Sequence, residues 1–229
     1  MNQFVSKGIV LHRINYGEKD RILTLLLNDK GKIRVLAKSV RSNKSKLAGG
    51  IELFSESTVG LAKSRSDLYI LTSGRLDRHF GNIAKDLQRT MLGYEFLKII
   101  NKLCEDGSGE DFYRILLSSL EGLDDPEIDK EVTELWFNIQ VLHETGSLPN
   151  LQTAPNGTDL EQANMYSFDY DSQCFTPNNR GGFSQNHIKL LRLILSTKNP
   201  KKLVQIENIE DLVSAAHRLS HQLVEQYVR

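Results

Sequence analysis

The chain is poor in cysteine, has no long apolar run and carries no excess charge. Cys104 and Cys174 are its only cysteines among 229 residues, too few for a disulfide scaffold and typical of a reducing compartment. No apolar run approaches the roughly 20 residues that span a bilayer, and the polar start MNQFVSKGIV is unlike a secretion signal. We therefore expect a cytoplasmic protein without membrane contact.

The signatures of common enzymes are also missing. The chain has no phosphate-binding glycine loop, no glycine-rich dinucleotide turn, no His-Glu-x-x-His and no Gly-x-Ser-x-Gly. His217 and His221 lie four residues apart and could share a metal. Zinc usually needs three or four protein ligands and no third is placed here, so solvated or cap-adjacent histidines are the stronger alternative. We expect no enzymatic activity, no cofactor and no metal, and we expect Cys104 to be a core residue.

The zero net charge hides an uneven distribution. Residues 1–80 carry 15 Lys and Arg against 7 Asp and Glu, whereas residues 86–179 carry 5 against 18. Residues 180–229 are basic again, with 8 against 4. A basic end joined to an acidic middle points weakly to a polyanionic partner such as nucleic acid; like-charged surfaces that keep the protein dispersed are the alternative.

The first 80 residues are typical of β-structure. Five short runs with turn signals between them predict strands, and no helical period interrupts them. The sequence Asn28-Asp29-Lys30-Gly31 predicts a hairpin turn, because Asp and Gly tolerate the backbone angles it requires. The predicted strands, which favour a small barrel, are Phe4–Ile14, Asp20–Asn28, Lys32–Ala37, Ile51–Ala62 and Leu68–Leu76.

The period changes at about residue 80. From Ile83 to Leu103 apolar residues recur three or four apart, which predicts a helix, and Phe112–Leu120 predicts another. Further helices are expected to open at Asp125-Pro126-Glu127, at Ser184 and at Asn208, the last through a capping box with Asp211. The fold class is therefore α+β, with a domain at 1–79, a helical domain at 80–229 and a loop-rich insert near 147–182.

Basic residues concentrate on the third predicted strand and on the loop that follows it. Side chains alternate along a strand, so Lys32, Arg34 and Lys38 share one face while Val35 faces the core. These residues form what we call the basic strip: Lys32, Arg34, Lys38, Arg41, Lys44 and Lys46, with no acidic residue among them. Such a strip predicts phosphate binding; an edge strand protected by lysines is the alternative, but protection needs only one or two charges.

The order and spacing of several short motifs resemble the bacterial RecO family of DNA repair proteins. They run from Gly8-Ile9-Val10-Leu11 through Ala37-Lys38-Ser39-Val40-Arg41 and Glu134-Leu135-Trp136 to Gly146-x-x-Pro149. This resemblance implies an N-terminal OB-fold barrel and a helical domain with a zinc-finger-like insert. It also implies a nucleoid-associated recombination mediator that binds single- and double-stranded DNA and anneals complementary strands. Implied partners are RecR, the C-terminal tail of the single-strand-binding protein (SSB) and, indirectly, RecA.

The sequence departs from that family in two places. Ser39 replaces a frequent glycine, so the loop is expected to leave the strand at a different angle. Many members bind zinc through two Cys-x-x-Cys pairs; here the first pair aligns with Ala154 and Asn156, and the second keeps Cys174 but has Pro177. One thiolate cannot hold a structural zinc. The insert is expected to be held by packing of its aromatic residues Tyr166, Phe168, Tyr170 and Phe175.

An acidic tail that ends in apolar residues needs a receptor with cations beside an apolar pocket. Lys98 and Lys102 lie four apart on one predicted helix, and Arg114 on the next can join them. A second basic group, Lys189, Arg192, Lys201 and Lys202, is the competing site. Two other functions stay open: an OB-type RNA-binding protein, and a helical scaffold that does not bind DNA directly.

Overall fold

The structure, a computed structural model, describes residues 3–42, 45, 47–64, 67–106, 109–161 and 163–228. The chain divides into two compact units, residues 1–126 and 127–229. The fold is α+β, as predicted: strands fill the N-terminal part and helices follow. Within the described residues, no helix combines the length and apolar character that crossing a bilayer requires.

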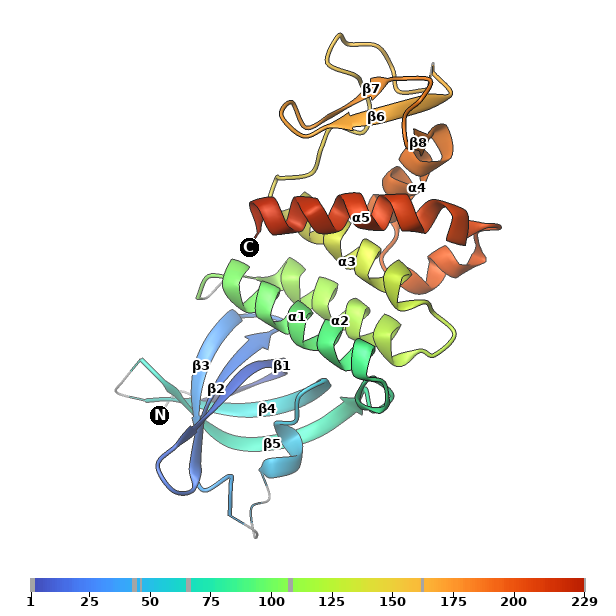
Figure 1. Ribbon diagram of the computed structural model, residues 1–229. Helices are drawn as coiled ribbons and strands as arrows, with labels where there is room; N and C mark the ends of the chain where they lie inside the picture. The colour runs from blue at the N-terminus through green and yellow to red at the C-terminus, as the bar shows by residue number, and fades with distance from the viewer. Residues whose placement is uncertain are drawn as a thin grey trace. The chain divides into compact units, whose positions relative to one another are not determined.

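Five strands of the first unit close into a barrel (Figure 1). They are β1 (Gln3–Tyr16), β2 (Asp20–Leu27), β3 (Gly31–Ala37), β4 (Ser55–Lys63) and β5 (Tyr69–His79). Their order around the barrel is β1-β2-β3-β5-β4, with β3 and β5 parallel and the other pairs antiparallel. This is the topology of an OB fold. The turn at residues 28–30 joins β2 to β3 as predicted, and Gly31 after it has φ 64°.

The barrel core follows the predicted alternation. Leu23 and Leu25 of β2 and Val35 of β3 are at most 1% exposed. The predicted strand from Ile51 is wrong at its start, because β4 begins only at Ser55. Ile51 is itself fully buried, and a short 3-10 turn at Ala48–Gly50 precedes it. Ile51 belongs to the buried apolar cluster of the barrel although it precedes the strand, and an apolar run alone does not distinguish a buried turn from a strand.

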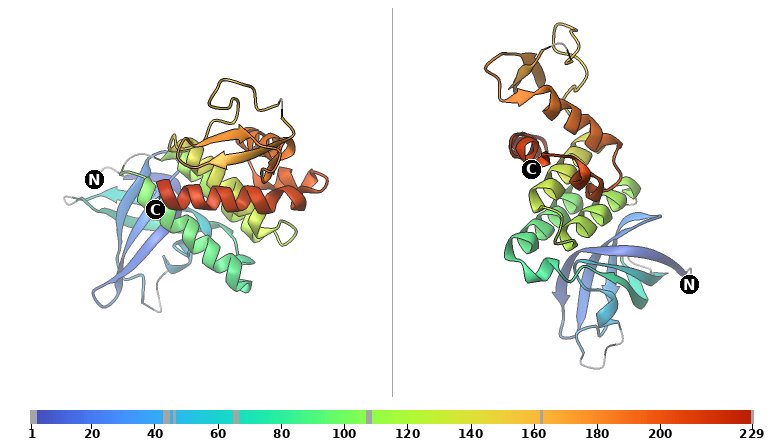
Figure 2. Two further views of the ribbon diagram at one scale, coloured as in Figure 1. Left: turned by 45° about the horizontal axis from the view of Figure 1, so that its top comes forward. Right: turned by 90° about the vertical axis from the view of Figure 1, so that its right-hand side faces the viewer.

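Two helices, α1 (Leu87–Leu103) and α2 (Glu110–Asp124), lie side by side against the barrel (Figure 2). Buried polar contacts tie them to it: Tyr113 of α2 donates a 2.7 Å hydrogen bond to Glu56 of β4, whose side chain is 3% exposed. The first compact unit therefore ends beyond α2, at Pro126, and not at the end of the barrel. Whether residues 1–79 and 80–229 act as separate domains stays a prediction.

The second unit contains α3 (Lys130–Glu144), α4 (Gln185–Ser196) and α5 (Ile209–Tyr227). Helices α3 and α5 pack along each other, and a short 3-10 helix at Pro200–Gln205 precedes α5. The insert is more regular than predicted. It forms a three-stranded antiparallel sheet of β6 (Met165–Asp169), β7 (Cys174–Pro177) and β8 (Phe183–Ser184).

One predicted helix start is wrong. Asp125 follows the end of α2, and the α3 cap is Asp129, whose carboxylate accepts from the backbone N–H of Glu131 at 2.7 Å. The start predicted at Asn208 is confirmed, because Asn208 is the N-cap of α5; it has φ 54° and makes no side-chain capping bond, so the predicted capping box with Asp211 does not form. Ser184 does precede α4 as predicted, and its backbone N–H donates to His187 Nδ1 at 3.0 Å. Acidic and amide residues occur at many turns, so composition alone does not select which one caps a helix.

Aromatic packing holds the insert sheet, as expected from the sequence. Tyr166 and Phe175 are fully buried. Phe168 packs edge-on against Phe175 with ring centroids 5.0 Å apart, and Phe175 packs against Phe183 at 5.4 Å. Such pairs each stabilise by about 0.5–1.5 kcal/mol beyond the area they bury.

Candidate nucleic-acid interface

The basic strip begins on β3, where the strand period places cations outside the barrel. Arg34 is exposed while its neighbours Ile33 and Val35 are buried. Lys38 is exposed in the turn that follows the strand. The alternation predicted from the sequence is therefore confirmed. It gives Arg34 and Lys38 the solvent access that phosphate contact requires.

The turn after β3 is held against the β1–β2 turn. The backbone N–H of Ser39 donates to Asp20 Oδ1 at 2.7 Å, and that of Arg41 donates to the Lys19 carbonyl at 2.9 Å. The Arg41 guanidinium reaches the Gly17 carbonyl at 3.4 Å. These bonds bring exposed Lys19 to the end of the barrel that carries Lys38 and Arg41. Lys19 is not among the residues predicted from the sequence, because only the fold brings these two turns together.

Ser39 adopts the conformation that a glycine would favour. Its φ is 54°, in the left-handed region that costs an ordinary residue about 1 kcal/mol or more. The bond to Asp20 fixes this conformation. Nothing in it supports the expectation that serine redirects the loop, because the backbone keeps a glycine-type turn.

Lys32 differs from the rest of the strip. Its side chain is 16% exposed, and its ammonium donates to the Asn101 carbonyl at the end of α1 at 3.0 Å and lies 3.9 Å from Asp106. Cations near a helix C-terminus are favourable because the last carbonyls lack partners. Lys32 thus fastens α1 to the barrel. Lys44 and Lys46 lie outside the described residues.

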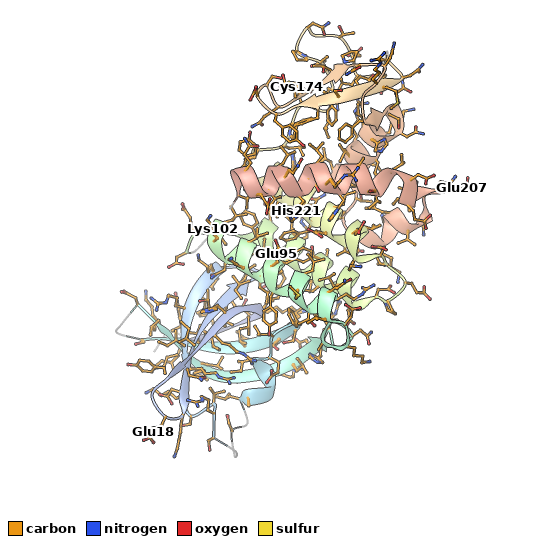
Figure 3. The ribbon with its side chains drawn as sticks, viewed as in Figure 1. Glu18, Glu95, Lys102, Cys174, Glu207 and His221 are labelled. Carbon is orange, nitrogen blue, oxygen red and sulfur yellow. The ribbon has the colours of Figure 1, made fainter. Side chains whose placement is uncertain are left out.

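The proposed tail site lies on α1 and α2. Lys98 and Lys102 are both exposed on α1 (Lys102 is labelled in Figure 3). Arg114 of α2 bonds to Asp111 at 3.0 Å, one turn away on its own helix. Lys98 also has exposed apolar neighbours, which the sequence alone did not predict. At helical spacing before it lie three exposed residues: Leu87 at 76%, Met91 at 63% and Tyr94 at 50%.

The structure removes one member, Arg192, from the competing basic group in the second unit. Arg192 on α4 donates to the Leu151 carbonyl at 2.8 Å and pairs with Glu161 at 2.6 Å, so it fastens the insert. Lys189, Lys201 and Lys202 are exposed. The three lysines stay a candidate site without the arginine that sequence reasoning grouped with them.

His217 and His221 share one carboxylate, a third option that the sequence analysis did not consider. His217 Nε2 lies 2.8 Å from Glu134 Oε2, and His221 Nδ1 lies 3.1 Å from Glu134 Oε1. The Glu134 carboxylate beside His217 raises the pKa of that imidazole above its ordinary 6.5, although burial acts in the opposite direction. Burial opposes ionisation of Glu134 most strongly, yet the two histidines outweigh it and hold its pKa below 4.5. Among the described residues, no cluster of three or more His, Cys, Asp or Glu side chains could hold a metal.

These features define an OB-barrel protein with a helical second unit. Residues 1–80 match the family described as "Recombination protein O N terminal". A Dehalococcoides mccartyi protein named "DNA repair protein RecO" is 31% identical over 206 residues, covering 87% of this chain and 81% of the relative. The chain belongs to the RecO family.

Two further relatives carry the same name. One from Desulfatibacillum aliphaticivorans is 30% identical over 154 residues, covering 66% of this chain and 60% of the relative. One from Alkaliphilus metalliredigens is 25% identical over 226 residues, covering 97% and 91%. Likeness therefore extends through the second unit, although the first of these alignments spans less than two thirds of the relative's length.

Proposed function

We propose that this protein is a recombination mediator in DNA repair. It binds single- and double-stranded DNA, anneals complementary strands and assists loading of the RecA recombinase on strands coated by SSB, together with RecR. The observation that carries the proposal is a group of exposed cations along β3 and at the end of the barrel that follows it: Arg34 in the middle of the strand, and Lys38, Arg41 and Lys19 in the two turns at that end. Membership of the RecO family supports it.

Phosphate contact accounts for the arrangement of these cations. Arg34 and Lys38 come from β3 and the turn after it, while Lys19 comes from the β1–β2 turn, so cations lie on both sides of the strand end. In an OB fold, the face of strands 2 and 3 and the first interstrand loop are the surfaces that bind oligonucleotides. Cations so placed can follow a phosphate backbone without reading its sequence.

The test is a DNA titration at two or more salt concentrations. Each neutralised phosphate contributes a slope of about −0.7 to log affinity against log salt on single strands, and about −0.9 on duplex. Lys38→Glu/Arg41→Glu should weaken binding to all sequences alike and make the single-strand slope shallower by about 1.4.

Lys201→Glu/Lys202→Glu is the matched control. It changes the net charge equally but alters exposed lysines of the second unit. Similar losses in both double variants would show that only net charge matters and would contradict the strip. Competition between matched DNA and RNA strands tests the alternative of an RNA-binding protein, since phosphate contacts alone do not separate the two.

We place the SSB tail on α1. The tail ends in acidic residues and a terminal apolar pair. Exposed Met91 and Tyr94, followed on the same helix face by Lys98 and Lys102, offer apolar and cationic contacts in that order. Arg114 is the weakest member of this proposed set, because Asp111 already neutralises its charge.

Calorimetry with a synthetic tail peptide tests the site. We expect micromolar affinity, corresponding to about −8 kcal/mol, and a loss of at least tenfold in Lys98→Glu/Lys102→Glu. Lys189→Glu/Lys202→Glu, with the same charge change in the second unit, should bind like the wild type. If Lys189→Glu/Lys202→Glu loses affinity and Lys98→Glu/Lys102→Glu does not, the tail binds at the competing basic group. If both double variants bind the tail like the wild type, neither site is the receptor.

A further inference from the structure

Strands β3 and β5 close the barrel through a short parallel pairing. They pair at Val35–Tyr69 and Leu36–Ile70, and because β5 begins at Tyr69, the first half of β3 lies ahead of the start of β5. A depression of about 420 Å³ lies beside this part of β3, with Ile33 among its lining residues. Its volume falls in the range of small-ligand sites, roughly 300–1,000 Å³. It is separate from the end of the barrel where Lys38 and Arg41 lie against the β1–β2 turn.

One side of the depression is basic. Lys30 in the β2–β3 turn and Arg34 on β3 are both exposed and line it. The Lys30 ammonium lies 5.0 Å from the centroid of the Phe4 ring, which restricts where that long side chain extends. Lys32 also lines the site, but its ammonium already donates to the Asn101 carbonyl and lies beside the Asp106 carboxylate. Lys30 and Arg34 are thus the cations available to an anionic ligand.

The other side is aromatic and acidic. Tyr69 at the start of β5 lines the depression and is half-buried. Phe4 packs edge-on against it, with centroids 5.7 Å apart and an interplanar angle of 88°. This packing restrains the tyrosine ring. Asp67, two residues earlier, adds a carboxylate to the same lining, and Asp106, which lies beside Lys32, adds a second.

We propose that this depression holds one unstacked nucleotide of a single DNA strand. The base lies against Tyr69 and the adjoining phosphates face Lys30 and Arg34. Stacking on an aromatic ring tolerates every base, since each has a π face. The inference rests on the proposed function and deepens it, because it gives single strands a contact that a paired duplex cannot make.

Asp67 makes the site selective. At the position where cytosine carries an exocyclic amine, which donates to a carboxylate, thymine carries a carbonyl, which cannot; the ring N3–H is the one donor that thymine keeps on that edge. A strand of cytosines should therefore bind better than a strand of thymines, by roughly 5- to 10-fold.

Fluorescence anisotropy with three probes tests the site: oligo-dC and oligo-dT of about 12 nucleotides, a length within the span of one OB fold, and a blunt duplex. Tyr69→Leu should weaken oligo-dC binding by roughly 5- to 100-fold and leave duplex binding unchanged. Tyr69→Phe keeps the ring and should bind like the wild type. Asp67→Asn should remove the preference for cytosine, whereas Glu18→Gln, the same charge change in the exposed β1–β2 turn (Figure 3), should keep it.

The proposal is overturned if Tyr69→Leu melts like the wild type and binds oligo-dC equally well. Equal weakening on duplex and single strands also overturns it, because duplex bases cannot enter the depression. Loss of binding by Lys38→Glu/Arg41→Glu together with wild-type behaviour of Tyr69→Leu would leave the proposed function standing and remove this site alone. A wild-type protein that binds none of the three probes would refute the proposed function itself.

Discussion

The carboxylate shared by two histidines should make the stability of the second unit depend on pH. Glu134 on α3 is 14% exposed, and His217 on α5 is 19% exposed. Both side chains are more buried than those of an ordinary surface pair, which contributes about 0–1 kcal/mol. They are more exposed than those of a fully buried pair, whose breaking costs roughly 3–5 kcal/mol. We expect Glu134→Gln to lower the free energy of unfolding by about 1–3 kcal/mol at pH 6, between these two limits.

The direction of the pH dependence follows from the two pKa shifts. The pKa of His217 is raised above 6.5, so its contribution is complete below pH 6.5 and is lost as the pH rises through the folded value. The pKa of Glu134 is lowered below 4.5, so its contribution is complete above pH 4.5 and is lost as the pH falls through the folded value. The pair should therefore stabilise most between pH 4.5 and 6.5 and less at both higher and lower pH.

A double-mutant cycle of Glu134→Gln and His217→Gln isolates the pair. Trp136, the only tryptophan, is buried on α3 two residues from Glu134. Its fluorescence during urea unfolding therefore reports the unit that contains the pair, which matters because two units need not unfold together. We expect a coupling of about 1–2 kcal/mol at pH 6 that decreases as the pH rises above 6.5.

His221→Gln serves as the comparison. His221 is 38% exposed and lies 3.1 Å from Glu134 and 3.6 Å from Glu225, so solvent screens it more than it screens His217. Its coupling to Glu134 should be the smaller of the two. A coupling between Glu134 and His217 that is equal at pH 6 and pH 9, or absent at both, would refute the assignment of charge to this pair.

Four further predictions concern local features. Ser39→Gly should raise the thermal unfolding midpoint, because glycine adopts φ 54° at lower cost; a lower midpoint would contradict the strain. Tyr113→Phe should cost about 1–3 kcal/mol in urea unfolding by removing a donor from buried Glu56, and an unchanged midpoint would refute this. A fragment of residues 1–126 should give the dispersed spectrum of a folded protein, whereas 1–79 should not, because the latter loses the helices that cover the barrel. Purified protein should contain no stoichiometric zinc by elemental analysis, since the insert has a single cysteine.

Local patterns in the sequence determined most of the secondary structure. Alternation at a period of two placed Arg34 outside and Val35 inside, because successive side chains of any strand point to opposite faces. The helical period after residue 83 likewise predicted α1, although the first of those residues lie in a short 3-10 turn and the helix itself begins at Leu87. These features depend on neighbours a few residues away, so the sequence contains their cause.

Partners distant in the chain were decided only by the tertiary structure. Lys32 looks like the other cations of the strip, yet Asn101, 69 residues later, accepts its hydrogen bond. His221 contacts Glu134, which lies 87 residues earlier in the chain; the sequence alone suggested solvent or a metal as its partner. Charge and period give a side chain its chemistry and its face, but its partner depends on which elements pack beside it. That packing is set by burial summed over whole helices and strands, which no local pattern contains.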